Sequence, residues 1–288
     1  MQPAAFVLSA FGDEIDDDLE SQLRSLRELR IGSLEFRSAW GKNVLHLNDS
    51  ELLAVSRLCQ EYSISISCIG SPIGKTAITE PVEIELKNLT RIIEISQKLG
   101  CQQIRIFSFF PPPQMSQDQL DYLVDEAAAR LGRLAKLAEQ HNVLLLLENE
   151  KGVVGDTPQR CFALMRRAAG PHLQFLWDPA NFVQVMAETP MRNGWPPLAE
   201  YVSYIHVKDA RLSDGSVCAA GEGDGQLPEL LTALIERGYK GVLALEPHLA
   251  SAGPHGGFSG PEGMRYAVKK LRGLLQSVGG LEQAAGGG

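Results

Sequence analysis

Eight short apolar runs alternate along the chain with stretches whose residue pattern is typical of helices. Strands that alternate with helices predict a parallel sheet, and about eight such units in 288 residues predict a single closed (β/α)8 TIM barrel, an α/β fold. The alternative is an open doubly wound sheet, but the turn after the first run lacks the G-x-G-x-x-G pattern with which such folds bind dinucleotides. The runs are residues 5–11, 33–37, 63–70, 103–110, 143–150, 173–181, 202–210 and 241–248.

Helix start signals support this alternation. Asn48 or Asp49 is suited to cap the helix that follows the second run, and Ser116 is suited to cap the longest predicted helix, residues 116–141. Pro261 stands where the first turn of the last helix accepts a proline. Three of the predicted helices therefore have a recognisable beginning, and each run is followed by sequence compatible with a helix.

No linker or change of composition divides the chain. With 44% hydrophobic and 22% charged residues it resembles an ordinary globular domain. We expect a barrel domain over residues 1–278 and a flexible, glycine-rich tail over residues 279–288. The segment AGEGDGQLPELL is also glycine-rich, but no G-K-[ST] follows, so a flexible loop before a helix is favoured over a phosphate cradle.

The net charge and the cysteines limit which partners and which cellular compartment the chain is suited to. A formal net charge of −8 repels phosphate backbones, which argues against nucleic acid. Five cysteines without a C-x-x-C pair indicate reduced thiols. No run approaches the roughly 18 apolar residues of a membrane span, and the N-terminus lacks the basic start of a signal peptide. We therefore expect a soluble cytoplasmic protein with no membrane partner.

Polar side chains end the last four runs at the same depth. In a barrel the carboxyl ends of the strands meet at one face, so these side chains should converge there. Three carboxylates and one imidazole form a ligand set for one divalent cation, and without a cation the carboxylates would repel one another. The predicted metal ligands are Glu148, Asp178, His206 and Glu246.

Further polar residues share this face or the turn beside it. Lys208 and Arg37 could hold a substrate hydroxyl, carboxylate or phosphate, or could act as counter-ions for the acidic mouth. The predicted substrate-binding residues are Glu35, Arg37, Asn181, Lys208 and His248.

Four segments carry a resemblance to a known family. In order and spacing the chain contains LLLLEN, WDPAN, YIHVKD and LALEPH, and it resembles the xylose isomerase-like TIM-barrel superfamily, in particular its sugar phosphate isomerase/epimerase branch. The resemblance implies one divalent ion held by Glu148, Asp178, His206 and Glu246, with Glu148 and Glu246 as the catalytic acid/base pair. It also implies abstraction of an α-proton from a keto-sugar or sugar-like polyol through a metal-bound enediolate. The carboxylate-rich ligands favour Mn²⁺, Mg²⁺ or Co²⁺, with Zn²⁺ possible.

One position departs from the pattern of the ketose 3-epimerases in this superfamily. These enzymes usually carry a histidine three residues after the aspartate, where this chain has Asn181, and an amide cannot carry a proton. A dehydratase of a cyclic keto-polyol on the same metal site is therefore kept as an alternative.

Two other readings remain open. A non-catalytic sugar-binding barrel would need no chemistry at the site. A DNA-repair endonuclease with three zinc ions would need several histidines, but of six only His206 and His248 lie at strand exits, while His141 and His172 precede their strands. A small-molecule sugar or polyol is the expected partner. The branch often forms homo-oligomers.

Overall fold

Eight parallel strands close into a barrel, as predicted. The computed structural model describes residues 5–186, 189–249 and 259–283. Strands pair in the order β12-β9-β8-β7-β6-β5-β2-β1, and a further parallel pairing of β12 with β1 closes the ring, so the open sheet is excluded. The barrel strands are β1 (Ala5–Phe11), β2 (Ser33–Phe36), β5 (Ser65–Ile69), β6 (Gln103–Ile106), β7 (Leu144–Glu148), β8 (Leu173–Trp177), β9 (Val202–Val207) and β12 (Val242–Leu245).

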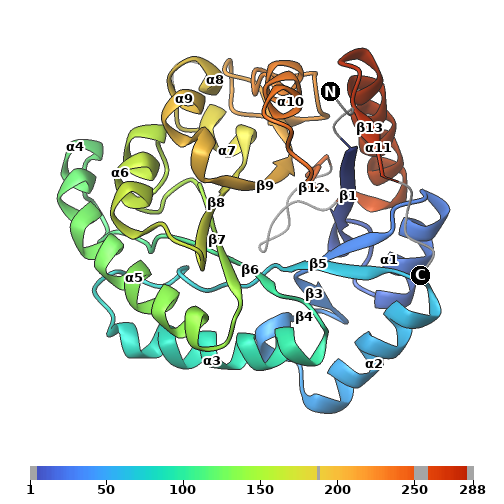
Figure 1. The fold of residues 1–288 in the computed structure, drawn as a ribbon, viewed down its shortest axis with the longest axis horizontal. Helices are drawn as coiled ribbons and strands as arrows, with labels where there is room; N and C mark the ends of the chain where they lie inside the picture. Colours follow the sequence, from blue (N-terminus) through green and yellow to red (C-terminus); the bar gives the residue numbers. More distant parts are fainter. Residues whose placement is uncertain (1–4, 187–188, 250–258, 284–288) are drawn as a thin grey trace.

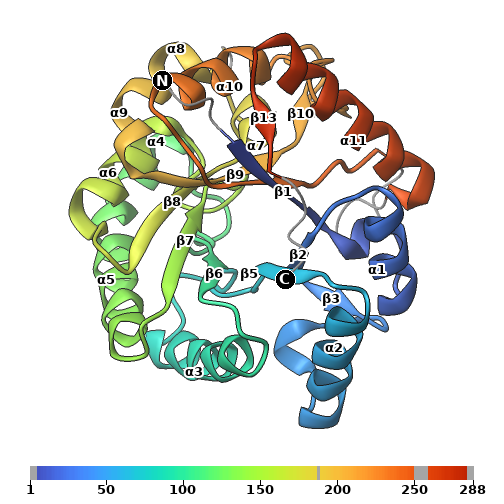
Figure 2. The same cartoon turned by 45° about the vertical axis from the view of Figure 1, so that its right-hand side comes forward.

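Helices surround this ring on the outside (Figures 1 and 2). Their apolar faces pack on the outward side chains of the strands to form one large core. The long helices are α1 (Leu19–Glu28), α2 (Asp49–Glu61), α3 (Val82–Lys98), α5 (Val124–Gln140), α6 (Pro158–Ala168), α10 (Leu227–Glu236) and α11 (Gly260–Ser277). The short ones are α4 (Gln117–Leu120), α7 (Pro179–Val183), α8 (Pro190–Asn193) and α9 (Trp195–Leu198), with 3-10 turns η1 (Gly12–Glu14), η2 (Val44–His46), η3 (Asp121–Leu123) and η4 (Ala199–Tyr201). No helix of the described residues is long and apolar enough to cross a membrane.

The predicted helix starts are mostly correct. Asn48 caps α2 in a reciprocal capping box with Glu51, and Pro261 lies in the first turn of α11. The single helix predicted over residues 116–141 is wrong in its first turns. The 3-10 turn η3 separates α4 from α5 there, because bonds between residues three apart replace the regular pattern.

The chain end differs from the expected flexible tail. Within residues 279–288, the short strand β13 (Leu281–Glu282) pairs in parallel with Ala5 and Phe6 of β1, and Figure 2 shows these two elements side by side. Arg272 of α11 also forms an ion pair with Glu282 at 2.7 Å. Backbone pairing thus fixes the first part of the segment, which composition alone does not indicate, and residues 284–288 lie outside the described residues.

The barrel interior is filled beneath the carboxyl ends of the strands. A small apolar cluster includes Leu146, Leu176 and Tyr204. Ser67 Oγ links this layer through contacts of 3.0 Å to the Tyr204 hydroxyl and 2.7 Å to Ser9 Oγ. This layer forms a floor, so any ligand binds above it at the strand exits.

Candidate metal centre and active site

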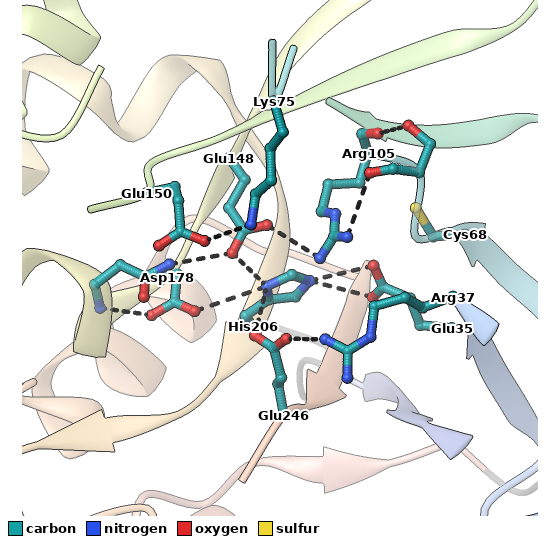
Figure 3. A network of polar contacts seen from close by, with 12 residues as sticks. Glu35, Arg37, Cys68, Lys75, Arg105, Glu148, Glu150, Asp178, His206 and Glu246 are labelled. Carbon is teal, nitrogen blue, oxygen red and sulfur yellow. Dashed lines mark hydrogen bonds and ion pairs between the residues drawn. The ribbon is translucent and has the colours of Figure 1, made fainter. Parts of the chain in front are cut away.

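The four predicted metal ligands lie together at the carboxyl ends of neighbouring strands. Each offers one ligand atom, and these atoms all lie within 4.8 Å of one another. All four side chains are buried, and Figure 3 shows them directed toward one another. Glu148 ends β7, Asp178 follows β8, His206 lies within β9, and Glu246 follows β12.

His206 lies at the centre of this cluster. Its Nδ1 atom is 3.1 Å from Glu148 Oε1 and 3.7 Å from both Asp178 Oδ2 and Glu246 Oε2. Burial opposes charge on the imidazole, but Glu148 and Glu35 outweigh burial and raise the pKa of His206 well above its usual value. The protonated ring thus supplies one of the positive charges between the carboxylates.

Glu35 lies behind His206 and does not line the cavity. Both of its carboxylate oxygens are 3.2–3.3 Å from His206 Nε2, and its side chain is fully buried. Histidine ligands commonly donate their second N–H to a carboxylate, which fixes the ring and its tautomer. The position of Glu35 fits this orienting function, whereas the sequence suggested contact with substrate.

Asp178 has two functions in the structure. Its Oδ1 atom caps the short helix α7 by accepting the backbone N–H of Asn181 at 2.9 Å. Its Oδ2 atom points into the cluster, 2.9 Å from Lys208 Nζ. One oxygen of Asp178 therefore stabilises the local helix, and the other is available to the candidate site.

Two cations hold Glu246. Lys208 Nζ lies 3.0 Å from Glu246 Oε2, and Arg37 Nη1 lies 2.7 Å from Glu246 Oε1. Arg37 also binds both oxygens of Asp13, at 2.7 and 3.0 Å, so each of its three guanidinium nitrogens contacts a carboxylate. Burial raises the pKa of Glu246, but Lys208 and the other nearby cations outweigh burial and lower it well below the usual range. The carboxylate is therefore ionised at neutral pH.

His248 completes this side of the site. Its Nε2 atom is 3.3 Å from Glu246 Oε1 and 3.1 Å from Glu14 Oε1. Its backbone has φ +46° and donates its N–H to Glu14 Oε2 at 3.1 Å. The same oxygen accepts a hydrogen bond from Ser259 Oγ, so Glu14 joins the first loop of the barrel to the last.

Glu148 has fewer charged partners than Glu246. Asn181 Nδ2 donates to Glu148 Oε1 at 3.2 Å and to the Asn149 carbonyl at 2.9 Å. Burial raises the pKa of Glu148, but His206 and Arg105 outweigh burial and lower it to about 2. Asn181 thus occupies the expected place beside a candidate catalytic carboxylate, where it can donate a hydrogen bond but cannot carry a proton.

The sequence reasoning missed Arg105. This residue lies in β6, is 5% exposed, and its Nη1 atom is 3.3 Å from Glu148 Oε2. The available signal was a charged residue within the apolar run QIRIFSFF. A buried charge needs a charged partner or a ligand. An inward-facing residue near the carboxyl end of a barrel strand can reach both, because the acidic cluster and the ligand site lie there.

The glycine-rich segment after β9 is organised around Asp209. The Asp209 carboxylate accepts backbone N–H groups from Ala210, Gly221, Gly223 and Gly225 at 2.8–3.0 Å. A side chain at Gly223 or Gly225 would collide with this carboxylate. The prediction of a loop was correct, but the glycines make room for a buried anion and were wrongly taken only as a sign of flexibility.

A cavity of about 1070 Å³ opens above the cluster. Its walls include five of the predicted site residues, Glu148, Glu246, Arg37, Lys208 and His248. They also include residues outside that prediction: Asp13, Lys75, Arg105, Phe107 and Glu150.

The residues present fit a divalent cation. Three buried carboxylates and one imidazole converge, and within the described part of the chain Glu148 Oε2 and Asp178 Oδ2 have no hydrogen bond of acceptable geometry despite nearby cations. Lys208 lies against two of the ligand carboxylates, where it partly neutralises them. The four residues could therefore hold one metal ion.

The remaining histidines do not extend this cluster. Among the described residues, Glu148, Asp178, His206 and Glu246 form the one group with metal-ligand spacing. His172 Nδ1 lies 2.8 Å from the carbonyl of Val143, which precedes β7 at the opposite end of the barrel. His255 lies outside the described residues.

Comparisons with known proteins agree with the fold. A D-tagatose 3-epimerase-like protein is 17% identical and superposes with a TM-score of 0.75 over 95% of this chain and 98% of that chain. The probable 3-DHS dehydratase of Bacillus anthracis is 15% identical, with a TM-score of 0.71 over 93% and 98% of the two chains. A xylose isomerase-like TIM barrel protein of Mycobacterium smegmatis in complex with magnesium is 17% identical, with a TM-score of 0.66 over 96% of each chain.

The sequence comparisons define the family. An uncharacterised protein of Methanocaldococcus jannaschii is 23% identical over 146 residues, which is 46% of this chain and 47% of that protein, so the match spans about half of this curated relative. The family model described as xylose isomerase-like TIM barrel matches residues 23–274. The chain therefore belongs to the xylose isomerase-like TIM barrel family.

Proposed function

We propose that this protein is a divalent-metal-dependent isomerase or epimerase that acts on a keto-sugar or a sugar-like polyol. The observation that carries the proposal is the pair Glu148 and Glu246, two ionised carboxylates on β7 and after β12, the outer two of the four neighbouring strands, beneath a cavity lined by charged residues. Structural relatives that are named as an epimerase-like protein and a probable dehydratase support a sugar-modifying enzyme.

The chemistry follows from the state of these carboxylates. An ionised Glu148 or Glu246 can take the proton from the carbon next to the substrate carbonyl; the electron pair of that C–H bond then forms a C=C double bond, and the π pair of the carbonyl moves to its oxygen. A divalent ion held by Glu148, Asp178, His206 and Glu246 would act as a Lewis acid that stabilises the developing negative charge. Return of the proton to the former carbonyl carbon, with transfer of the hydroxyl proton to the former carbonyl oxygen, gives an isomer, and return to the opposite face of the same carbon gives an epimer.

The surrounding residues prepare the site for this reaction. Glu35 orients His206, while Arg37 fixes Glu246 from the side away from Lys208. Lys208 has a protonated ammonium at the cavity wall because Asp178 and Glu246 outweigh burial and raise its pKa well above the usual value. When the ammonium moves away from Asp178 and Glu246, it can donate a hydrogen bond to a substrate hydroxyl. We infer Mg²⁺, Mn²⁺ or Co²⁺ as the ion, and the magnesium complex of one structural relative supports this set.

A dehydratase is the second candidate, and a specific feature favours it. Asn181 cannot shuttle a proton beside Glu148, whereas Lys208 carries a proton that could pass to a departing β-hydroxyl group. Loss of that hydroxyl as water after α-proton abstraction would form a C=C double bond in conjugation with the carbonyl. The first step is the same in both candidates, so one exchange experiment covers both.

The experiment measures deuterium wash-in from heavy water at the substrate α-carbon by mass spectrometry. The chelated protein is loaded with Mg²⁺, Mn²⁺ or Co²⁺ and offered a panel of ketoses and cyclic polyhydroxy ketones. We expect metal-dependent wash-in that Glu246→Gln and Glu148→Gln each reduce at least about hundredfold, the lower range for loss of a general base. Glu150→Gln is the matched control, since this carboxylate lines the cavity outside the metal cluster.

Three results contradict parts of the proposal. Unchanged wash-in by Glu246→Gln would remove Glu246 from the proton path. An equal loss of wash-in in Glu150→Gln would show that the loss depends on the change of charge in the cavity and not on the metal cluster. A chain that retains metal and binds a sugar without any wash-in would favour the non-catalytic sugar-binding barrel.

A further inference from the structure

The cavity is richer in cations than the chain as a whole. Six lysine and arginine side chains line it against five carboxylates, although the protein has a formal net charge of −8. Most of these cations are occupied by protein carboxylates. Arg37, for example, makes three contacts of 2.7–3.0 Å with Asp13 and Glu246. Arg105 is also paired with a carboxylate, Glu148, but at a longer distance of 3.3 Å.

Arg105 is buried but poorly satisfied. Its two polar contacts are long: 3.3 Å from Nη1 to Glu148 Oε2 and 3.4 Å from Nη2 to the Ser71 carbonyl. Its Nε–H has no hydrogen-bond partner among the residues that the structure describes. Charge-assisted bonds of arginine are normally about 2.7–2.9 Å long, and burial of unused guanidinium donors is costly. A side chain that is 5% exposed and lines the cavity thus retains donors for a ligand (Figure 3).

Aromatic rings fix the direction of this guanidinium. Its central carbon lies 4.7 Å from the ring centre of Phe107 and 5.4 Å from that of Phe11. Lys75 Nζ lies over the same Phe107 ring at 4.2 Å, so two cations share one aromatic wall of the cavity. Lys75 also lines the cavity, and its ion pair with Glu150 at 3.0 Å is partly exposed and therefore weak.

We propose that Arg105, assisted by Lys75, forms a subsite for an oxyacid group, so that the substrate is a keto-sugar or polyol bearing a carboxylate or a phosphate. The inference rests on the proposed function, because it names the substrate class of that site. The planar fork of arginine matches two oxygens of such a group, and the long contacts of Arg105 leave these donors available. Arg105 Nη1 lies 3.3 Å from Glu148 Oε2, so the subsite adjoins the metal cluster within the same cavity.

Three ligands that differ only at carbon 6 provide the test: D-fructose, D-fructuronate and D-fructose 6-phosphate. Calorimetry measures their binding to the chelated protein and to the Mg²⁺-loaded protein, so no turnover is needed. We expect at least one anion to bind about tenfold or more tightly than D-fructose, the effect of one charged hydrogen-bonding partner. The two anions then show whether the group is a carboxylate or a phosphate.

Variants connect this preference to Arg105. Arg105→Gln should abolish the preference for the anion, and Arg105→Lys should retain part of it, because lysine keeps the charge without the fork. Arg133→Gln makes the same change of charge outside the cavity, at an exposed pair with Glu83, and should leave the preference unchanged. Thermal unfolding shows whether each variant is folded, and Arg105→Lys carries the test if Arg105→Gln is not.

The inference and the proposed function can fail separately. Equal affinities for the three ligands, or an anion preference that persists in Arg105→Gln and Arg105→Lys, would overturn the subsite. Wash-in with neutral ketoses alone would also overturn the subsite while the isomerase proposal stands. An anion preference that depends on Arg105, without wash-in from any substrate, would support the subsite and contradict the enzymatic proposal.

Discussion

Lys208 is predicted to compete with the metal ion for its ligands. Its ammonium lies 2.9 Å from Asp178 Oδ2 and 3.0 Å from Glu246 Oε2, which are oxygens of two predicted ligands. A cation and a divalent ion about 5 Å apart repel each other by roughly 7 kcal/mol at an effective dielectric of about 20. Solvent and movement of the lysine reduce this repulsion, so we expect Lys208→Met to tighten metal binding by about tenfold to a hundredfold, or about 1.4–2.8 kcal/mol.

The same substitution should destabilise the metal-free protein. It leaves buried carboxylates without their neutralising ammonium, and loss of one partner from a buried pair costs about 3–5 kcal/mol. An unfolding entropy of about 2.1 cal/mol/K per residue gives roughly 0.6 kcal/mol/K for a chain of this length. The melting temperature of the metal-free variant should therefore fall by about 5–8 °C, and saturating metal should restore much of this loss because the ion takes over the neutralisation.

Calorimetric titration of the chelated protein with Mn²⁺ measures the affinity, and thermal unfolding with and without metal measures the stability. Lys75→Met is the matched control, because Lys75 lines the same cavity but pairs with Glu150 and not with a predicted ligand. An unchanged or weaker affinity in Lys208→Met would refute the competition. An equal gain in Lys75→Met would assign the effect to the general charge of the cavity.

Three further outcomes follow from single contacts. Burial opposes charge on His248, but nearby carboxylates outweigh burial and raise its pKa to about 9. In the chelated protein, wild type should therefore be more stable than His248→Gln, and this difference should be largest below the unfolded-state pKa of about 6.5. The difference should disappear as the pH rises through about 9, and urea unfolding at a series of pH values measures it. Gly74 and Gly152 both have positive φ, but of the two only Gly74 would bring a Cβ against backbone, 2.1 Å from the Phe107 carbonyl oxygen. Gly74→Ala should therefore lower the free energy of unfolding by at least about 2 kcal/mol more than Gly152→Ala, and equal losses would contradict the collision. Asp209→Asn should destabilise the protein by about 2–4 kcal/mol in urea unfolding, because each carboxylate oxygen accepts two backbone N–H groups and the amide nitrogen would face one of these pairs with its own donors; a neutral effect would contradict this account of the loop.

Much of the candidate site was accessible from the sequence. The carboxyl ends of parallel strands meet at one face, so the four polar residues that end the last four runs had to lie near one another once the barrel was inferred. The same reasoning placed Arg37, Lys208 and His248 in the cavity wall. It did not identify Arg105, because a charged residue in an apolar run has no local partner that reveals its purpose.

The amino-acid sequence alone determined the repeating unit, the closed barrel and the positions of the four converging side chains, because period and strand ends are local properties of the chain. The tertiary structure decided which groups touch. Glu35 approaches His206 across 171 residues of sequence, and Glu14 joins His248 across 234. β13 pairs with β1 from the far end of the chain. Such contacts depend on strand register and on side-chain direction across the closed ring, and no local pattern encodes either.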